Sequence, residues 1–404
     1  MGSESGLEWP LTLDVPALVA DGWSPFPFRE FIVKIHGRCD LSCDYCYMYE
    51  MADQSWRNQP RRMPPDIVDQ VARRIGEHAR SHRTANISLI LHGGEPLLAG
   101  HELVWNLVTA TRKAVGPEVR VNAGVQTNGV GLDEPYLELF AELGVRVGVS
   151  LDGGADAHNT HRRFPSGRGS YAAVSVALQR LRQDQFRHLF SGLLCTIDLR
   201  NDPIATYEAL AEFDPPRIDF LLPHGTWDAP PPGRRPDPAD APYADWLITI
   251  FDHWYPAPRI DIRLFGEIMR LILGRPSSSE AVGLSPARMV VIETDGSIEQ
   301  VDTLKATYQG AAAMGLNVTR DPFDAALLTP GVAARQIGAR ALSAQCRACP
   351  IHQVCGGGMY AHRYKSGTGF ANPSVYCADL MRLINHIRDA IHDDIDARLL
   401  RRKL

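Results

Sequence analysis

The sequence lacks the features that mark membrane-spanning, exported and nucleic-acid-binding proteins. It contains no apolar run near the roughly 20 residues that a membrane helix requires. Its first residues, Met-Gly-Ser-Glu-Ser-Gly, have neither the basic start nor the hydrophobic stretch of an export signal. The formal net charge of -5 disfavours a nucleic-acid footprint. We therefore expect a cytoplasmic protein with no membrane or nucleic-acid partner.

Disulfide bonds are not expected either, although the chain has eight cysteines. In a cytoplasmic chain, cysteines grouped at close spacings favour metal ligation over disulfides. All but one fall into two such groups. The exception is Cys195, which stands alone in the apolar stretch Gly-Leu-Leu-Cys-Thr-Ile and which we assign to core packing. The 404 residues, 45% of them hydrophobic, are enough for two domains.

Short apolar segments alternate with longer helix-like segments up to about residue 255, which is the pattern of βα units around a parallel sheet. We expect strands at 31–36, 87–91, 120–125, 146–150, 189–197 and 218–222. Because six units are too few for a closed eight-stranded barrel, the sequence predicts an α/β fold with a partial, open-sided (β/α)6 barrel. In barrels of this type the chemistry lies at the C-terminal ends of the strands.

The other regions predict a second domain after the barrel. We divide the chain into an N-terminal extension at 1–30, the barrel at 31–255, a bridging region at 256–288 and a domain at 289–404 that ends in a helix from about residue 375. The stretch 228–242 is too proline-rich for a helix or strand and predicts a loop or lid. A strand followed by Asp295-Gly296 predicts a hairpin at the start of the second domain.

The first cysteine group directly follows the first expected strand. Cys39, Cys43 and Cys46 lie in the run Cys-Asp-Leu-Ser-Cys-Asp-Tyr-Cys. This spacing supplies three thiolates, so one iron of a four-iron cluster stays open to a substrate or cofactor. On spacing alone, a zinc loop or a chance cluster is the alternative.

Polar motifs follow the next three expected strands, where they would meet at one barrel mouth. They are His92-Gly93-Gly94-Glu95-Pro96, Gln126-Thr127-Asn128-Gly129 and Ser150-Leu151-Asp152-Gly153. Each alone could be a turn, but their repetition favours a shared site. Further along, Arg162 could clamp a carboxylate through its planar guanidinium. His158 and His161 have metal-like spacing, but we interpret them as solvated or structural because no carboxylate or thiolate is evident near them.

The second cysteine group contains four possible ligands and predicts a closed metal site. It consists of Cys346, Cys349 and Cys355, at spacings of x2 and x5, and of Cys377 further on. A structural zinc is the alternative, since all-cysteine zinc sites favour pairs of close spacings. The wide gap before Cys377 is less typical of such a site, so we favour an iron–sulfur cluster.

Together these motifs closely resemble the radical S-adenosylmethionine (SAM) enzymes with a C-terminal SPASM domain, including the anaerobic sulfatase-maturating enzymes. The resemblance implies SAM as cofactor, a SAM-binding [4Fe–4S] cluster on the first cysteine group and an auxiliary [4Fe–4S] cluster on the second. It implies SAM contacts from Tyr45 near the adenine, Gly93, Gly94 and Glu95 at the methionyl amine, Ser150 and Asp152 at the ribose, Arg162 at the carboxylate and Gly225 at the adenine.

The second domain departs from the SPASM pattern in an ordered way. The four ligands of the outer auxiliary cluster are matched, but those of the inner cluster are not: Glu280, Val301 and Met359 stand at or beside the expected cysteine positions. The resemblance therefore implies a single auxiliary cluster that acts as an electron relay. Asp302 matches the position of the catalytic proton acceptor in the sulfatase-maturating enzymes. An exposed loop carboxylate is the alternative for this residue.

Three stretches resemble more closely the FxSxx-type maturases that form three-residue cyclophanes in ribosomally synthesised peptides. They include Phe-Leu-Leu-Pro-His-Gly-Thr-Trp-Asp and Asn-Pro-Ser-Val-Tyr-Cys-Ala-Asp-Leu. The implied reaction joins an aromatic ring carbon to the β-carbon of a residue two positions later in a precursor peptide, with a 5′-deoxyadenosyl radical as the initiator. The implied electron donor is of the flavodoxin or ferredoxin type.

Two other functions remain open on the sequence. Another SPASM chemistry, such as serine or cysteine oxidation, thioether formation or epimerisation, would use the same motifs. A metal-binding scaffold or electron-transfer protein is the non-catalytic alternative, but such a protein has no need of the Gly-Gly-Glu-Pro and Ser-x-Asp-Gly strand ends.

Overall fold

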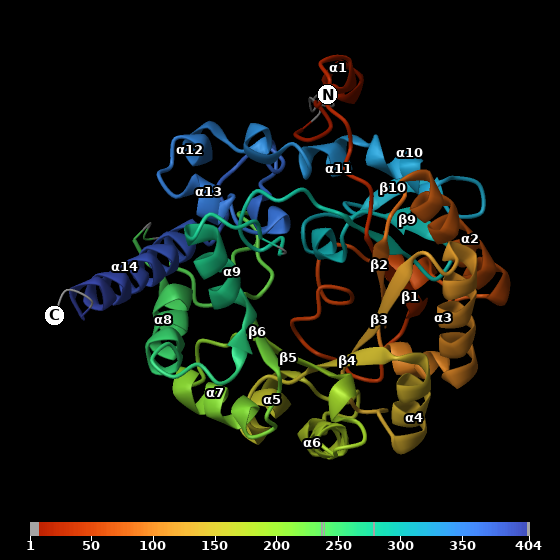
Figure 1. Ribbon diagram of the computed structural model, residues 1–404, viewed down its shortest axis with the longest axis horizontal. Coiled ribbons are helices and arrows are strands. Elements are labelled where there is room, and N and C mark those ends of the chain that lie inside the picture. The colour runs from red at the N-terminus through yellow and green to blue at the C-terminus, as the bar shows by residue number, and fades with distance from the viewer. Residues whose placement is uncertain (1–7, 236, 238, 278, 402–404) are drawn as a thin grey trace.

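The computed structural model describes residues 8–235, 237, 239–277 and 279–401, in which a sheet curves around a central space (Figure 1). In this part of the chain the sheet has ten strands, in the order β10-β9-β8-β1-β2-β3-β4-β5-β6-β7. The two end strands do not pair with each other, so the barrel is open. The strands are β1 (Glu30–His36), β2 (Asn86–Gly93), β3 (Arg120–Thr127), β4 (Val145–Ser150), β5 (Phe190–Thr196), β6 (Arg217–Leu221), β7 (Asp261–Ile262), β8 (Met289–Ile292), β9 (Ser297–Glu299) and β10 (Ala313–Asn317).

Strands β1 to β7 are all parallel, and each pairs with the next along the chain. The six predicted strands correspond to β1–β6, so the predicted α/β fold with a partial parallel barrel is confirmed. The connecting helices lie mainly on the outside of the barrel (Figure 1). They are α2 (Pro65–Ser81), α3 (His101–Val115), α4 (Glu134–Leu143), α5 (Ala155–His161), α6 (Tyr171–Leu181) and α7 (Pro203–Ala211), followed by α8 (Pro242–Trp254) and α9 (Arg263–Ile272).

Local sequence signals set the ends of several of these helices. The side chain of Asp133 accepts a hydrogen bond from the backbone N–H of Tyr136 at 3.0 Å and so caps the start of α4. The same helix ends at Gly144, whose left-handed backbone is the common way to terminate a helix. Asp202 caps α7 in the same manner, through the N–H of Ala205 at 2.8 Å.

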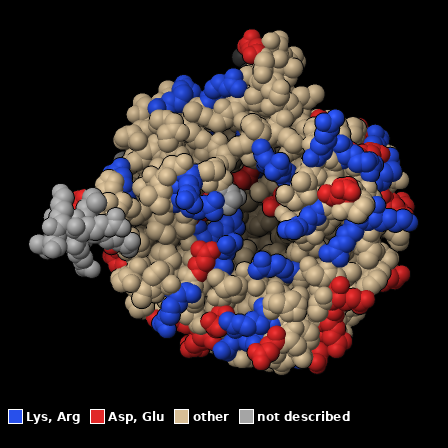
Figure 2. Space-filling view, in the orientation of Figure 1, with Lys and Arg blue, Asp and Glu red and all other residues tan. Residues whose placement is uncertain are grey.

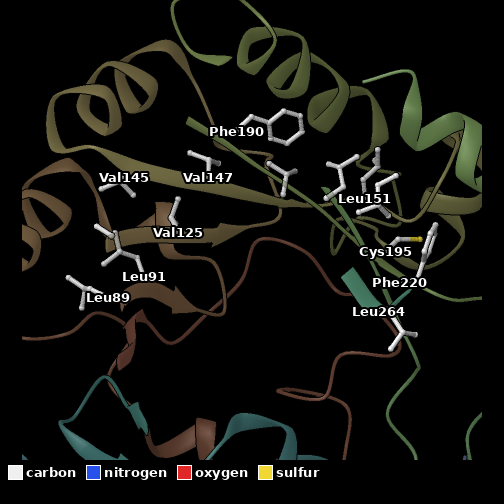
Figure 3. Packing of buried hydrophobic residues seen from close by; sticks show 14 of the residues in the cluster. Leu89, Leu91, Val125, Val145, Val147, Leu151, Phe190, Cys195, Phe220 and Leu264 are labelled. Carbon is white, nitrogen blue, oxygen red and sulfur yellow. The ribbon is translucent and has the colours of Figure 1, made fainter. Parts of the chain in front are cut away.

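Buried and more accessible side chains alternate along the strands, so that one face of the sheet packs in the core and the other faces the barrel lumen. In β2, Ile87, Leu89 and Leu91 are buried, whereas Ser88 and His92 on the opposite face are more accessible. Figure 3 shows the buried face of several strands packed into one apolar layer. Cys195 lies in this layer, as expected from its apolar surroundings in the sequence. The side chains of the other face are therefore available to line a site.

The sheet continues across the predicted boundary between the barrel and the second domain. β8 pairs in parallel with β1, with Phe31 opposite Val290. The predicted hairpin at Asp295-Gly296 joins β8 to β9 and is confirmed by their antiparallel pairing. Residues that we assigned to a separate domain therefore also extend the barrel sheet at its first strand.

Short helices and one long helix make up the rest of the C-terminal region. They are α10 (Phe323–Leu327), α11 (Pro330–Ala334), α12 (Ala344–Arg347), α13 (His352–Cys355) and α14 (Cys377–Arg401). The long helix α14 packs against α8 and α9, and it begins close to the expected position. At the other end of the chain, α1 (Val15–Ala20) precedes the barrel, and the carbonyl of Trp9 accepts a hydrogen bond from the N–H of Phe370 at 3.1 Å.

Two sequence-based expectations concern the chain outside the strands. The described residues of the proline-rich stretch 228–242 form no helix or strand before α8 begins at Pro242, and residues 236 and 238 of this stretch lie outside the described residues. No helix within the described ranges is long and apolar enough to cross a membrane.

Candidate active site

The first cysteine group lies in an irregular segment at the C-terminal end of β1. The backbone N–H of Leu41 and the side-chain amide of Asn128 both point to Cys39 Sγ, at 3.4 and 3.6 Å. Burial raises the pKa of Cys39, and burial, opposed by Arg162, raises the pKa of Cys43 to about 12. Burial raises the pKa of Cys46 as well, and a bound metal would replace the proton of each thiol. The donor set therefore fits the predicted SAM-binding cluster.

Gly93 and Gly94 allow two loops to approach each other at the end of β2. A Cβ atom at Gly93 would overlap the carbonyl oxygen of His36, and one at Gly94 would overlap Arg38 and the hydroxyl of Tyr49. Gly93 also has a positive φ of 147°. The structure thus explains both glycines by packing within the chain, and their predicted contact with the methionyl amine of SAM stays a prediction.

Glu95 is buried between the ends of β2 and β3. Its carboxylate accepts hydrogen bonds from the N–H of Leu97 at 3.0 Å, the hydroxyl of Thr127 at 2.7 Å and the N–H of Asn128 at 2.8 Å. Burial raises the pKa of Glu95 to about 7 despite these bonds. Because a carboxylate offers about four acceptor positions, one is left for a further donor such as the predicted amine.

Tyr45, Asp152 and Arg162 form one cluster near the ends of β4 and α5, in which Asp152 is buried and the other two are partly buried. The guanidinium Nε of Arg162 donates to Asp152 Oδ2 at 2.8 Å, and Cζ of the same guanidinium lies 5.5 Å from the ring centre of Tyr45. The Tyr45 hydroxyl donates to the same carboxylate, whose other oxygen accepts from the N–H of Thr196 at 3.0 Å. The sequence assigned Asp152 and Arg162 to different parts of SAM, whereas the structure pairs them with each other.

The remaining two predicted SAM contacts lie at other strand ends. Ser150, the last residue of β4, accepts a hydrogen bond from the side-chain amide of Gln126 at 3.1 Å. Gly225 follows β6, where a Cβ atom would approach Pro231 Cδ to 2.6 Å. The proline-rich stretch therefore requires a glycine at this position, and its predicted adenine contact is untested.

Asp302 points into the same region from the C-terminal part of the sheet. It begins the short 3-10 helix Asp302–Ala306 and is 5% exposed, so the alternative of an exposed loop carboxylate is wrong. Its carboxylate lies 3.2 Å from Lys34 Nζ and 3.8 Å from His92 Nδ1. The hydroxyl of Tyr47, the residue after Cys46, donates to Asp302 Oδ2 at 3.5 Å. The carboxylate thus contacts the segment that carries the first cysteine group.

A buried charge network that the sequence did not reveal supports Asp302. Lys34 is fully buried on β1 and binds Glu293 at 2.6 Å as well as Asp302. Lys305 lies 2.9 Å from Glu293 and 2.9 Å from Glu299. Burial alone would lower the pKa of Lys34, but the three carboxylates raise it above its usual value. Lys34 is therefore a fixed positive charge beside Asp302.

The four cysteines of the second group line one cavity between α12, α13 and α14. Cys346, Cys349, Cys355 and Cys377 share it with mainly apolar or uncharged neighbours that include Ile351 and Met381. Burial raises the pKa of Cys355 to about 11. Four convergent thiols in a lining whose other side chains, as described, are uncharged apart from the titratable His352 fit a closed cluster, as the sequence predicted.

The positions that resemble the inner cluster offer no such donor set. Val301 packs in a small apolar cluster with Leu304 and Phe370. Glu280 forms an ion pair with Arg335. Just before Met359, three successive glycines at 356–358 adopt positive φ, and Arg363 donates hydrogen bonds to their carbonyls. A tight, clamped turn therefore stands between the last α13 cysteine and Met359.

The two histidines with metal-like spacing have separate environments. His158 is buried, where its Nδ1 accepts from the N–H of Asp152 at 3.3 Å, which agrees with a structural role. His161 lies between Asp44 and Asp198, at 2.6 and 3.1 Å. Carboxylates do therefore approach His161, and the sequence could not show this because Asp44 and Asp198 are distant along the chain.

Comparisons with known proteins agree with this fold and site. Residues 33–210 match the family model of the radical SAM superfamily. The cysteine-type anaerobic sulfatase-maturating enzyme of Clostridium perfringens is 26% identical over 68% of this chain and 74% of that enzyme. Native anSMEcpe with bound AdoMet superposes with a TM-score of 0.76 at 21% identity, over 91% of this chain and 99% of that chain. Streptococcus suis SuiB bound to the precursor peptide SuiA gives 0.57 at 14% identity, over 90% and 78%.

These comparisons also bear on the cofactors. A radical SAM domain binds SAM and a [4Fe–4S] cluster, and the residue range of the match includes Cys39, Cys43 and Cys46. The four C-terminal cysteines supply a complete donor set for the auxiliary [4Fe–4S] cluster. The predicted cofactors are therefore confirmed, whereas the roles of individual residues in holding them stay predictions.

Proposed function

We propose that the chain, whose residues 33–210 match the radical SAM family model, is a radical SAM enzyme that forms a carbon–carbon cross-link in a ribosomally made precursor peptide. The link would join an aromatic ring carbon to the β-carbon of a residue two positions later. The observation that carries this proposal is that the buried carboxylate of Asp302 contacts Tyr47, the residue after Cys46, and is not among the residues that line the cavity of the second cysteine group. A ring addition must lose one proton and one electron, and the two cysteine sites and Asp302 divide these tasks.

Peptide or protein modification is supported by the relatives. Relatives of this chain are named for sulfatase maturation, and SuiB was solved with its precursor peptide. The three sequence stretches that resemble FxSxx-type maturases favour the cyclophane over other peptide chemistry. Figure 2 shows one face hollowed at its centre, with Lys and Arg side chains around the opening. Such an opening would admit a peptide segment from solvent.

The chain's own residues would hold the cofactors and then accept the proton that the aromatic ring loses. Cys39, Cys43 and Cys46 would ligate the first cluster, and Glu95, with its free acceptor position, would bind the amine of SAM. When bound, these cofactors supply a carbon-centred radical that removes one hydrogen atom from the substrate. Asp302 would accept the ring proton at its carboxylate, which lies 3.2 Å from Lys34 Nζ.

The partners follow from the same reaction. The first cluster needs an external one-electron donor, and we propose a flavodoxin or ferredoxin for this role. The substrate would be a precursor peptide with an aromatic residue two positions before the residue that loses its β-hydrogen.

Coexpression with a precursor peptide encoded beside this gene tests the proposal. We expect a product lighter by two hydrogens, with the loss localised by fragmentation to a three-residue window that resists internal cleavage. A loss of two hydrogens confined to one serine or cysteine would instead indicate side-chain oxidation. An unchanged peptide, with 5′-deoxyadenosine still formed, would reject that peptide class as the substrate.

A further inference from the structure

Four aromatic or imidazole rings form a continuous row between the two cysteine groups. Tyr47 directly follows Cys46 in the sequence, and Tyr376 directly precedes Cys377. Two histidines, His224 and His362, stand between these tyrosines. Each end of the row is thus covalently adjacent to a proposed cluster ligand.

The spacing within the row is that of packed ring pairs. The ring centres of Tyr47 and His224 are 4.9 Å apart, those of His224 and His362 are 5.6 Å apart, and those of His362 and Tyr376 are 4.9 Å apart. These values lie in the range of about 4.5–7 Å for favourable aromatic contacts. No step in the row requires a jump across a layer of other side chains.

Hydrogen bonds between distant parts of the chain hold the row in place. The hydroxyl of Tyr376 donates to the carbonyl of Pro223, which precedes His224, at 2.5 Å. The N–H of Val375 donates to the carbonyl of His362 at 2.8 Å. The indole N–H of Trp227 donates to the carbonyl of Pro373 at 2.8 Å. The loop after β6 is therefore fixed to the segment that carries Cys377.

Hydrogen bonding does not explain the two imidazoles. Nδ1 of His224 and Nε2 of His362 are buried and have no hydrogen-bond partner within the described ranges. A buried polar atom without a partner is unfavourable, so an apolar ring would pack there more favourably. Burial lowers the pKa of His224 to about 4, so its ring is neutral at physiological pH. The place of each ring in the row therefore explains the two histidines better than local hydrogen bonding does.

The row begins where the reaction would release its proton. Tyr47 donates its hydroxyl to Asp302 at 3.5 Å, so the first ring of the row lies beside the proposed proton acceptor. A substrate held next to Asp302 would therefore be close both to the proton acceptor and to Tyr47, the first ring of the row.

We propose that Tyr47, His224, His362 and Tyr376 form the electron-transfer path between the first cysteine site and the auxiliary cluster. The proposal rests on the function proposed above. The ring adduct radical loses one proton to the carboxylate of Asp302 and one electron through the row, which forms the aromatic product and reduces the oxidised auxiliary cluster by one electron. A one-electron carrier of the ferredoxin or flavodoxin class then reoxidises that cluster. Each step between neighbouring ring centres is 4.9 to 5.6 Å, so the row acts through the close contact of its rings and not through the filling of space alone.

Replacement of His362 tests the path without any peptide substrate. The anaerobic protein with both clusters and SAM is reduced by a light flash with limiting deazaflavin, and freeze-quench EPR follows the electron as it redistributes between the clusters. We expect His362→Leu to lose the fast phase of this exchange and His362→Phe to keep it, because only phenylalanine preserves a ring. His224→Leu should lose the fast phase too, which guards against a folding defect in one variant.

Controls separate the path from cluster assembly. Iron content and both cluster potentials should be unchanged in each variant. His253→Leu removes an imidazole from a surface ring pair with Tyr207 and should keep the fast phase. A fast phase that persists in both leucine variants would overturn the proposal. Because the measurement needs no peptide, such a result would not contradict the proposed cross-linking reaction. Conversely, a failed coexpression would not contradict the proposed electron path.

Discussion

The three cysteines after β1 lie among charged and hydrogen-bonding side chains, whereas the four C-terminal cysteines line a mainly apolar cavity. Cys39 has Asn128 at its sulfur, and the pair of Asp152 and Arg162 lies beside Cys43. Among the described residues, the lining of the second cavity has no carboxylate or guanidinium, and Arg363 and Arg234 act on Cys355 and Cys377 from outside it. A site that must bind the amine and carboxylate of SAM needs polar partners, whereas a site that only changes redox state does not. The surroundings thus distinguish the two sites as clearly as the number of thiols does.

Removal of one ligand from the first group should have the largest effect. In Cys43→Ala, we expect iron to fall from about eight to about four per chain and formation of 5′-deoxyadenosine to stop, because a four-iron cluster cannot assemble on two thiolates. Iron analysis and chromatography of the SAM products measure both. Continued SAM cleavage by this variant would contradict the ligand assignment.

Removal of one ligand from the second group should separate the two sites. In Cys377→Ala, iron should again approach about four per chain, but SAM cleavage should continue while cross-linked product is lost. Mass spectrometry of the peptide, together with quantification of 5′-deoxyadenosine, gives the ratio of cross-linked product to SAM cleaved. Full product yield, or zinc in place of iron at this site in the unaltered protein, would return the second group to a structural role.

Asp302→Asn should uncouple SAM cleavage from product formation while both clusters stay in place. The amide keeps the shape of the side chain but cannot accept the ring proton, so we expect product formation to fall about 10²- to 10⁴-fold. Iron content and 5′-deoxyadenosine should match the unaltered protein. An unchanged product yield would remove Asp302 from the reaction.

The charge network around the first site should also be visible in stability. Lys34→Met leaves Asp302 buried without its cation and Glu293 paired with Lys305 alone, and should lower the free energy of unfolding by about 3–5 kcal/mol. The double variant Lys34→Met/Asp302→Asn removes the unpaired charge and should be less affected. Urea denaturation of the holoprotein compares them. Equal losses in both would show that Lys34 stabilises by packing instead.

The smallest effect is expected at the cysteine that belongs to neither site. Cys195→Ala should leave iron content and SAM cleavage unchanged and cost only about 1 kcal/mol in stability, because the side chain is a small part of a large apolar layer. A drop in iron would mean that a third group of ligands exists.

The parallel barrel was predictable because its signals are local. Each of β1–β6 is an apolar segment between helix-like stretches, and the polar residues at their ends fall in the sequence where the sheet geometry requires them. Gly93, Gly94 and Glu95 could thus be placed at a strand end without any knowledge of their neighbours. Their packing against His36 and Tyr49 could not be foreseen.

The buried charges were not predictable because their pairing is long-range. In the sequence, Lys34 is a single charged residue within an apolar strand, and Glu293 and Lys305 lie in a different region of the chain. They meet only because β8 pairs in parallel with β1. The row of rings depends in the same way on the contact between the loop after β6 and the segment before Cys377.

The pairing of β8 with β1 also has a consequence during synthesis of the chain. Until residues 289–292 emerge, the first strand made has one open edge, and exposed strand edges invite pairing with other chains. At a translation rate of about 5–20 residues per second, this interval lasts on the order of tens of seconds. A cell that makes this protein must therefore shield a nascent barrel from its neighbours for that time, and slower translation upstream of β8 would lower the yield of active enzyme.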